Sequence, residues 1–183
     1  MSNKIVIIGS GLAGYSLAKE FRVLNKETPI TLITADRGDY YSKPQLSTAL
    51  GMKKSAQDLL MSIAEQMAQK LNIDSVTNKT IRSIDRDAKK IIADNFECAY
   101  DKLILTLGAT KLSVPLDGDA VDDVLSVNTL EEYEDFRNWL DGKKHIGILG
   151  CGLVGCEFAN DLINGGYEVT VMAPDHYPLQ RFV

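Results

Sequence analysis

The chain has 183 residues, of which 45% are hydrophobic and 25% charged, and its net charge is −5. This apolar content is sufficient for a folded core and excludes a disordered tail. The acidic balance, with basic residues scattered in short pairs, disfavours nucleic acid as a partner. No apolar stretch approaches the roughly 20 residues that cross a bilayer, and the N-terminus leads into a strand-like run rather than a signal peptide. We therefore expect a cytoplasmic protein without a membrane span.

Residues that form disulfides or bind metals are few. The three cysteines, Cys98, Cys151 and Cys156, include no Cys-x-x-Cys pair, and there are only two histidines. Three cysteines are too few and too odd in number for a disulfide framework. We expect no metal site, and we interpret Cys151 and Cys156 as small core residues.

The first structural signal is a strand followed by a glycine-rich turn. Residues 4–8 form an apolar run rich in β-branched side chains, which is typical of a strand buried on both faces. A helix is predicted next from the spacing of Leu17, Phe21 and Leu24. The turn between them has the pattern G-x-G-x-x-G and consists of Gly9, Ser10, Gly11, Leu12, Ala13 and Gly14. In such a turn the second glycine leaves room for a pyrophosphate, the third lets the helix pack on the strand, and the helix N-terminus faces the anion.

A second strand, at residues 30–33, completes a βαβ unit. Asp36 follows it, about 20 residues beyond the third glycine, where a carboxylate accepts hydrogen bonds from two ribose hydroxyls. The alternative is a solvated loop acid. The polar stretch from Ala35 to Gly51 has neither helix nor strand periodicity, and we interpret it as a ligand-facing loop.

The middle of the chain mixes helical and strand patterns. Ser55 is expected to cap one helix running to about Leu71. Residues 80–100 predict antiparallel strands around a turn at residues 85–87, and residues 102–107 predict another buried strand. A further helix is predicted from Leu130 to Leu140.

The strand–turn–helix–strand pattern then recurs between residues 145 and 172. Its turn consists of Gly150, Cys151, Gly152, Leu153, Val154 and Gly155. Either set of three glycines alone could be a simple glycine turn. Two such turns, each between a strand and a helix, predict two dinucleotide sites. The expected fold is therefore α/β, with two Rossmann-like dinucleotide-binding βαβ domains of the three-layer ββα type, at residues 1–114 and 115–183.

Five ordered motifs together resemble the FAD-dependent pyridine nucleotide oxidoreductases, which carry two dinucleotide-binding domains. The motifs are the first glycine turn, residues 32–36, residues 41–47 with the sequence YSKPQLS, residues 100–109, and the second glycine turn with Glu157. The resemblance is greatest to members that reduce rubredoxin, near the ferredoxin reductases of oxygenase systems. Members that reduce disulfides carry a Cys-x4-Cys pair in the region of residues 40–50, which contains no cysteine here.

The resemblance implies FAD at the first domain and NADH at the second. It implies that Lys43 and Glu157 are the catalytic residues, with Glu157 orienting the hydride donor or a cation such as Lys43. The expected FAD contacts beyond the first turn are Thr34, Ala35, Asp36, Lys43, Pro44, Ile81, Thr106 and Gly108. The expected NADH contacts are Gly150, Gly152, Leu153, Val154, Gly155, Glu157 and Asp175. Thr106-Leu107 stands where the family usually has Ala-Thr, and Ala173 stands where many relatives have the ribose-binding acid, so that Asp175 is the substitute.

The implied activity is transfer of a hydride from NADH to FAD and of single electrons to rubredoxin or another small iron protein, as supply to an oxygenase. Alternatives are ferredoxin, flavorubredoxin or oxygen as acceptor, and a nucleotide-binding module without catalysis. Members of the family continue well beyond residue 183, so we expect the N-terminal parts of both domains, with weak FAD binding and little turnover. The absence of an arginine close after Met172 favours NADH over NADPH.

Overall fold

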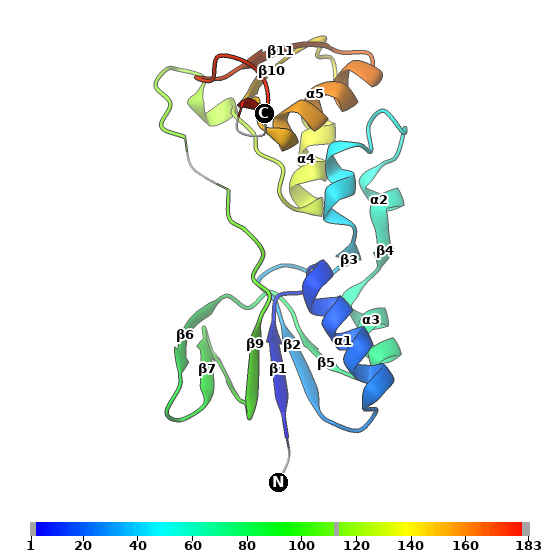
Figure 1. The fold of residues 1–183 in the computed structure, drawn as a ribbon, viewed down its shortest axis with the longest axis vertical. Helices are drawn as coiled ribbons and strands as arrows, with labels where there is room; N and C mark the ends of the chain where they lie inside the picture. Colours follow the sequence, from blue (N-terminus) through cyan, green and yellow to red (C-terminus); the bar gives the residue numbers. More distant parts are fainter. Residues whose placement is uncertain (1–2, 112–113, 181–183) are drawn as a thin grey trace. The chain divides into compact units, whose positions relative to one another are not determined.

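The computed structural model describes residues 3–111 and 114–180, and the chain divides into two compact units (Figure 1). Unit 1 comprises Met1–Tyr41 and Leu60–Ala109, and unit 2 comprises Ser42–Leu59 and Thr110–Val183. The division at residue 109 lies close to the expected boundary at Val114. The segment Ser42–Leu59, however, was expected in the first domain and belongs to unit 2.

Unit 1 is built on a parallel sheet with the strand order β5-β2-β1-β9. Its strands are β1 (Ile5–Ile8), β2 (Ile30–Ile33), β5 (Asp74–Val76) and β9 (Lys102–Leu105). Strand β1 is central, because Ile5 pairs with Ile30 of β2 on one side and with Lys102 of β9 on the other. All four residues of β1 and of β2 are buried, which explains their unbroken apolar sequence.

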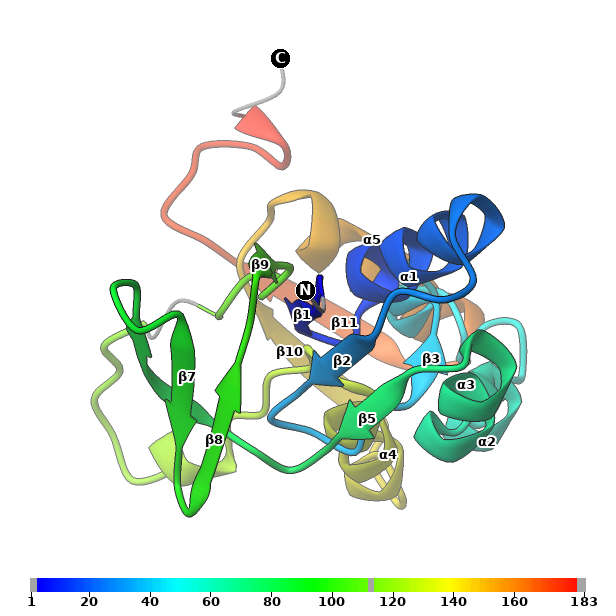
Figure 2. The ribbon, with the colours of Figure 1, turned by 90° about the horizontal axis from the view of Figure 1, so that it is seen from below.

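Two further layers cover this sheet. Helices α1 (Leu12–Leu24) and α3 (Ala64–Leu71) lie on one side, and the antiparallel strands β6 (Ile81–Asp85), β7 (Lys90–Ala93) and β8 (Phe96–Ala99) lie on the other (Figure 2). The three-layer ββα arrangement and the antiparallel strands at residues 80–100 are thereby confirmed.

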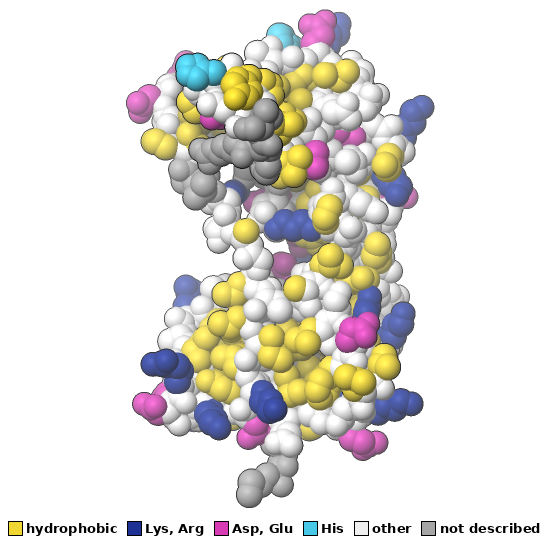
Figure 3. Space-filling model, in the orientation of Figure 1, with side chains coloured by type: hydrophobic (Ala, Val, Ile, Leu, Met, Phe, Trp, Pro, Cys, Tyr) yellow, Lys and Arg dark blue, Asp and Glu magenta, His cyan; other side chains and the backbone are white. Residues whose placement is uncertain are grey.

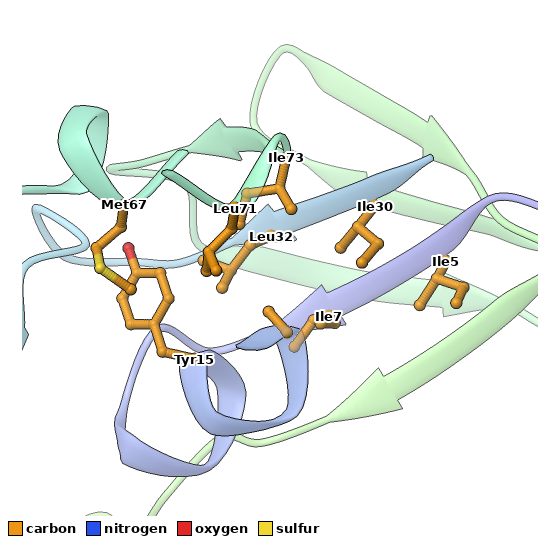
Figure 4. Packing of buried hydrophobic residues seen from close by; sticks show 9 residues of the cluster. Ile5, Ile7, Tyr15, Ile30, Leu32, Met67, Leu71 and Ile73 are labelled. Carbon is orange, nitrogen blue, oxygen red and sulfur yellow. The ribbon is translucent and has the colours of Figure 1, made fainter. Parts of the chain in front are cut away.

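The alternation of side chains along β1 supplies two separate cores. Ile5 and Ile7 pack with Tyr15 and Met67 on the helical side, as Figure 4 shows. Val6 and Ile8 point the other way and pack with Ile91. Successive side chains of a strand point to opposite faces, so a single strand contributes to both layers.

The single helix predicted from Ser55 to Leu71 is wrong. The structure has a short helix α2 (Ala56–Leu59), a strand β4 (Leu60–Ser62) and then α3. The i, i+3, i+4 pattern is interrupted because β4 pairs antiparallel with β3 (Tyr40–Tyr41), a long-range contact that local periodicity does not contain. The predicted cap is correct, since the Asp58 backbone N–H donates to Ser55 Oγ at 3.2 Å.

Unit 2 contains the parallel pair β10 (His145–Leu149) and β11 (Glu168–Met172), joined by helix α5 (Leu153–Asn164). It also contains helix α4 (Leu130–Trp139), which begins with a capping box between Thr129 and Glu132. The segment Ser42–Leu59 brings the 3₁₀ helix η1 (Lys43–Ser47) and α2 into this unit, and a further 3₁₀ helix, η2, spans Val121–Asp123. Hydrogen bonds to α4 and α5, described below, explain why this segment departs from the expected boundary.

Each sheet ends in strands without an outer partner among the described residues. In unit 1, β9 is an edge strand, and Leu105 at its end is 53% exposed. Hydrophobic side chains gather over this part of unit 1, where β1 and β9 lie (Figure 3). Such edges invite pairing with another chain. Within residues 3–111 and 114–180, no helix has both the length and the hydropathy needed to cross a bilayer.

Tyr15 connects the core of unit 1 to the loop that follows β2. Its side chain is fully buried, its ring meets Tyr40 edge-on at 5.4 Å, and its hydroxyl donates to the carbonyl oxygen of Gly38 at 2.6 Å. Burial raises the pKa of Tyr15 to about 12, with smaller contributions from the negative charges of Asp36, Asp39 and Glu65. The phenol therefore stays neutral and keeps its role as a donor well above physiological pH.

We predict that Tyr15→Phe lowers the free energy of unfolding by about 1 kcal/mol at pH 7, because one buried hydrogen bond is lost. Since the pKa of Tyr15 is raised in the folded state, the parent should lose stability as the pH rises from about 10 through 12, and the variant should lack this component. Urea unfolding at pH 7 and pH 11 measures both effects. Tyr100→Phe, at a partly exposed phenol, is the control, and equal stability of Tyr15→Phe and the parent at pH 7 would contradict the prediction.

Candidate nucleotide-binding site

The two glycine turns have the same backbone geometry. Gly9 and Gly150 lie at φ of +110° and +112°, a region that only glycine adopts readily. Gly11 and Gly152 precede their helices in extended conformation, and neither helix has a side-chain N-cap. The first N–H groups of α1 and α5 are thus left without a capping side chain, as an anion-binding helix N-terminus requires.

The third glycine of each turn is required by packing within the protein. A β-carbon on Gly14 would collide with the carbonyl oxygen of Gly9, and one on Gly155 would collide with that of Gly150. The helix therefore approaches the turn more closely than any side chain allows.

The second glycine of each turn is not required by packing. A β-carbon on Gly11 or on Gly152 would meet no atom within 4 Å. Their φ values of −65° and −73° are accessible to any residue. Glycine at these two positions therefore keeps open a space that no described part of the chain fills, which fits a group that approaches the backbone closely, such as a pyrophosphate.

Asp36 is joined to the first turn by hydroxyl groups. Thr34 Oγ1 donates to Asp36 Oδ1 at 2.7 Å, and Ser10 Oγ lies 3.0 Å from Thr34 Oγ1 and 3.2 Å from Asp36 Oδ1. The Gly38 N–H also donates to Oδ1, at 2.9 Å. One carboxylate oxygen is held by protein donors, while Oδ2 accepts from none of the described residues. The carboxylate is thus fixed in direction by the bonds to Oδ1.

The residues before Ile81 are bonded to the backbone of Thr34 and Asp36. The Asn78 N–H donates to the Asp36 carbonyl at 2.9 Å, and the Lys79 N–H donates to that of Thr34 at 2.9 Å. Ile81 itself begins β6 and packs against the core on the strand side of the sheet. Ala35 is exposed between Thr34 and Asp36. The structure therefore brings together the first turn and the end of β2, with the segment that leads into β6 alongside, whereas the side chain of Ile81 packs in the core.

Thr106 acts on the first turn from the neighbouring strand. Its hydroxyl lies 2.9 Å from the carbonyl oxygen of Ile8 and 3.0 Å from that of Gly9. These contacts direct the side chain to the protein backbone and hold the turn. Gly108, two residues on, is exposed and has a φ of +71°.

The second turn opens into a cavity within unit 2. The cavity has a volume of about 1340 Å³, and apolar residues of β10, α4 and α5 contribute to its wall. Every residue predicted to bind NADH lines it except Glu157: Gly150, Gly152, Leu153, Val154, Gly155 and Asp175. Asp175 also lies beside the turn, since its Oδ2 is 3.7 Å from Cys151 Sγ. Burial of the Cys151 thiol raises its pKa.

A smaller cavity, of about 470 Å³, lies in unit 1 and contains none of the predicted site residues. Arg22 is the cation in its wall. Its guanidinium donates to the backbone carbonyls of Leu71, Asn25, Thr28 and Asn72. The guanidinium of Arg22 is thus occupied by backbone carbonyls, so the cavity gives no indication of an anion site.

Glu157 lies in the second turn of α5. The helix begins at Leu153, and its first turn contains no acid. Glu157 Oε2 instead accepts a hydrogen bond from Ser47 Oγ at 2.6 Å. Ser47 is the last residue of η1, which also carries the exposed Lys43 and Pro44. Both predicted catalytic residues therefore belong to unit 2.

Two residues near this pair were not singled out from the sequence. Ser47 stands within the YSKPQLS motif but was given no role, and Asp161 lies one helical turn after Glu157. The sequence did offer one indication of Asp161, because it is an acid between the apolar helix positions Phe158 and Leu162. Its side chain is 4% exposed. Its two carboxylate oxygens accept hydrogen bonds from Leu50 and Gly51.

Comparison with known proteins gives close relatives over the whole chain. It is 49% identical over 170 residues to the rubredoxin-NAD(+) reductase of Alcanivorax borkumensis, covering 93% of this chain and 44% of that protein. It is 40% identical to the enzyme of the same name from Acinetobacter baylyi, covering 98% and 47%. The chain thus spans less than half the length of these curated relatives.

Solved structures agree with this relationship. The NADH:rubredoxin oxidoreductase of Clostridium acetobutylicum matches with a TM-score of 0.81 and 30% identity, over 98% of this chain and 46% of that one. A family model described as pyridine nucleotide-disulphide oxidoreductase matches residues 3–182. The two glycine turns, the three-layer unit and this match together show that the chain belongs to the pyridine nucleotide-disulphide oxidoreductase family.

Proposed function

We propose that the chain is the FAD- and NADH-binding part of a flavoprotein reductase that passes electrons from NADH to rubredoxin or a similar small iron protein. The observation that carries this proposal is the open space at the second glycine of each turn, because the protein's own packing does not explain glycine there. When bound, FAD accepts two electrons together and returns them singly, which couples a hydride donor to a one-electron acceptor.

In this proposal unit 1 binds FAD. The N–H groups at the start of α1 receive the pyrophosphate, and Asp36 Oδ2 accepts from the adenosine ribose. Thr106 holds the carbonyls of the turn and so fixes the direction of those N–H groups. The backbone near Ile81 faces the adenine, and Thr34, Ala35 and Gly108 line the path of the cofactor.

Unit 2 binds NADH in the cavity at the second turn. The start of α5 receives the pyrophosphate, and Asp175 takes the place of the ribose-binding acid. Glu157 orients the nicotinamide or Lys43. Lys43 is a flexible cation on an exposed turn, and with Pro44 it faces the flavin. The names of the relatives support rubredoxin as the acceptor. We also propose that the protein is cytoplasmic and that it supplies electrons to an oxygenase.

The function is tested by titrating the purified chain with FAD, recording the visible spectrum, and adding NADH without oxygen. We expect weak binding of FAD, seen as a perturbed flavin band, with slow bleaching on addition of NADH and return of the band when oxidised rubredoxin is added. Flavin binding without bleaching would favour a nucleotide-binding module without catalysis. Bleaching that ferredoxin reverses and rubredoxin does not would change the acceptor.

The glycine argument predicts opposite effects of two neighbouring substitutions. Gly11→Ala should leave the midpoint of thermal unfolding almost unchanged, because its β-carbon meets no protein atom, but should weaken FAD binding about tenfold or more. Gly14→Ala should destabilise unit 1 by roughly 2 kcal/mol or more, because its β-carbon collides with a backbone carbonyl. Calorimetry and flavin fluorescence measure the two effects. Unchanged FAD affinity in Gly11→Ala would argue against a pyrophosphate at this turn.

The role of Glu157 is predicted from its contact with Ser47. Glu157→Ala should slow the bleaching of bound flavin by NADH about tenfold or more, as expected when a reactant is no longer held in position. Ser47→Ala is the matched control, because it removes the hydroxyl partner and leaves the carboxylate. Stopped-flow absorbance gives both rates. Equal slowing in the two variants would show that Glu157 serves only to hold η1, and an unchanged rate in Glu157→Ala would refute its role in hydride transfer.

A further inference from the structure

The segment Ser42–Leu59, which we call the lysine segment, is bonded to helices α4 and α5 at three points. Ser47 donates to Glu157, and the backbone N–H groups of Leu50 and Gly51 donate to Asp161. Further along, Arg137 of α4 donates to the Lys54 carbonyl at 2.6 Å. Helices α4 and α5 thus bind four residues between Ser47 and Lys54, in a segment that lacks long regular structure.

Asp161 makes the most specific of these contacts. Its Oδ2 accepts from the Leu50 N–H at 2.9 Å, and its Oδ1 accepts from the Gly51 N–H at 2.7 Å. Each oxygen of the carboxylate meets one of two successive backbone donors. The side chain is 4% exposed, and a buried carboxylate is tolerated only where such bonds replace water. Hydrogen bonds to an ionised group are stronger than neutral ones.

The backbone of Leu50 and Gly51 also packs tightly against the C-terminal end of α5. A β-carbon on Gly51 would lie 2.9 Å from Asn164 Cβ and 3.0 Å from Asp161 Oδ1. From the other side, a β-carbon on Gly165 would lie 2.8 Å from a methyl carbon of Leu50. Residues 50 and 51 therefore sit directly on the end of α5, and the absence of a side chain at Gly51 is a condition of that contact.

Asp161 and Glu157 are four residues apart, so they lie on one face of α5, one turn from each other. Glu157 fixes the end of η1, and Asp161 fixes the turn that follows it. Two anchors on one rigid helix define both the position and the direction of the segment between them. Lys43 lies at the other end of η1 from Ser47, so it precedes both anchored points in the chain.

We propose that Asp161 is a positioning residue that fixes the lysine segment on the helix of the second glycine turn, and through it the placement of Lys43. The role assigned to Lys43 rests on the proposed function, whereas the anchor does not. The helix that follows the second glycine turn would then set the position of a lysine that serves the flavin.

The anchor is tested without any nucleotide, by amide hydrogen exchange of the whole chain measured by NMR. Asp161→Asn keeps the shape but places an amide N–H₂ against one of two backbone donors, so the amides of Leu50 and Gly51 should exchange roughly 10- to 100-fold faster. Gly51→Ala, which keeps the carboxylate and displaces the segment, should accelerate the exchange of Leu50. Asp135→Asn, the same change at an exposed position of α4, is the control. Unchanged exchange in Asp161→Asn would overturn the proposal.

The effect on Lys43 is tested by a double-mutant cycle on FAD affinity, with Asp161→Asn, Lys43→Met and the double variant. If Asp161 acts through Lys43, Asp161→Asn weakens FAD binding in the parent and has little further effect once Lys43 is replaced. Equal losses in both backgrounds would overturn the positioning role. An unchanged affinity in Lys43→Met would contradict the function proposed for Lys43, a failure that the exchange measurement separates from failure of the anchor.

Discussion

The contact on which both units depend is the approach of a helix to a backbone carbonyl across a glycine turn. In unit 1 the position of Gly14 against Gly9 leaves no room for a β-carbon, and in unit 2 Gly155 stands against Gly150 in the same way. This contact sets where each helix begins and aims its first N–H groups. The sheet, the acidic residue after the second strand and the space in front of the turn are arranged around that fixed point.

The two units surround this common element differently. In unit 1 the turn is supported by a four-stranded sheet that is covered on both faces, and Thr106 reinforces it from the adjoining strand. In unit 2 the described sheet has two strands, and the turn opens into a large cavity with apolar walls. The same local sequence pattern is therefore embedded in a more extensively bonded framework in one unit than in the other.

The lysine segment shows how a piece of chain is assigned to a unit by bonding rather than by its place in the sequence. Residues on either side of it belong to unit 1, and β3 and β4 pair where it leaves and returns. Its own hydrogen bonds go to α4 and α5. The pairing of β3 with β4 also breaks the helix that periodicity alone predicts between Ser55 and Leu71, so both departures from the sequence prediction come from long-range contacts.

Both glycine turns, three of the four strands of the central sheet, the antiparallel strands at residues 80–100 and the helix at Leu130 could be predicted from the sequence, because each is encoded by neighbouring residues. The fourth strand, β5, was not predicted. Asp36 could also be found, since its spacing from the turn is fixed by the length of the intervening helix. Only the tertiary structure joined Ser47 to Glu157 and Leu50 to Asp161, partners that are 110 and 111 positions apart. No local pattern specifies such pairs, because they depend on how separately encoded elements pack, and packing is decided by the whole chain.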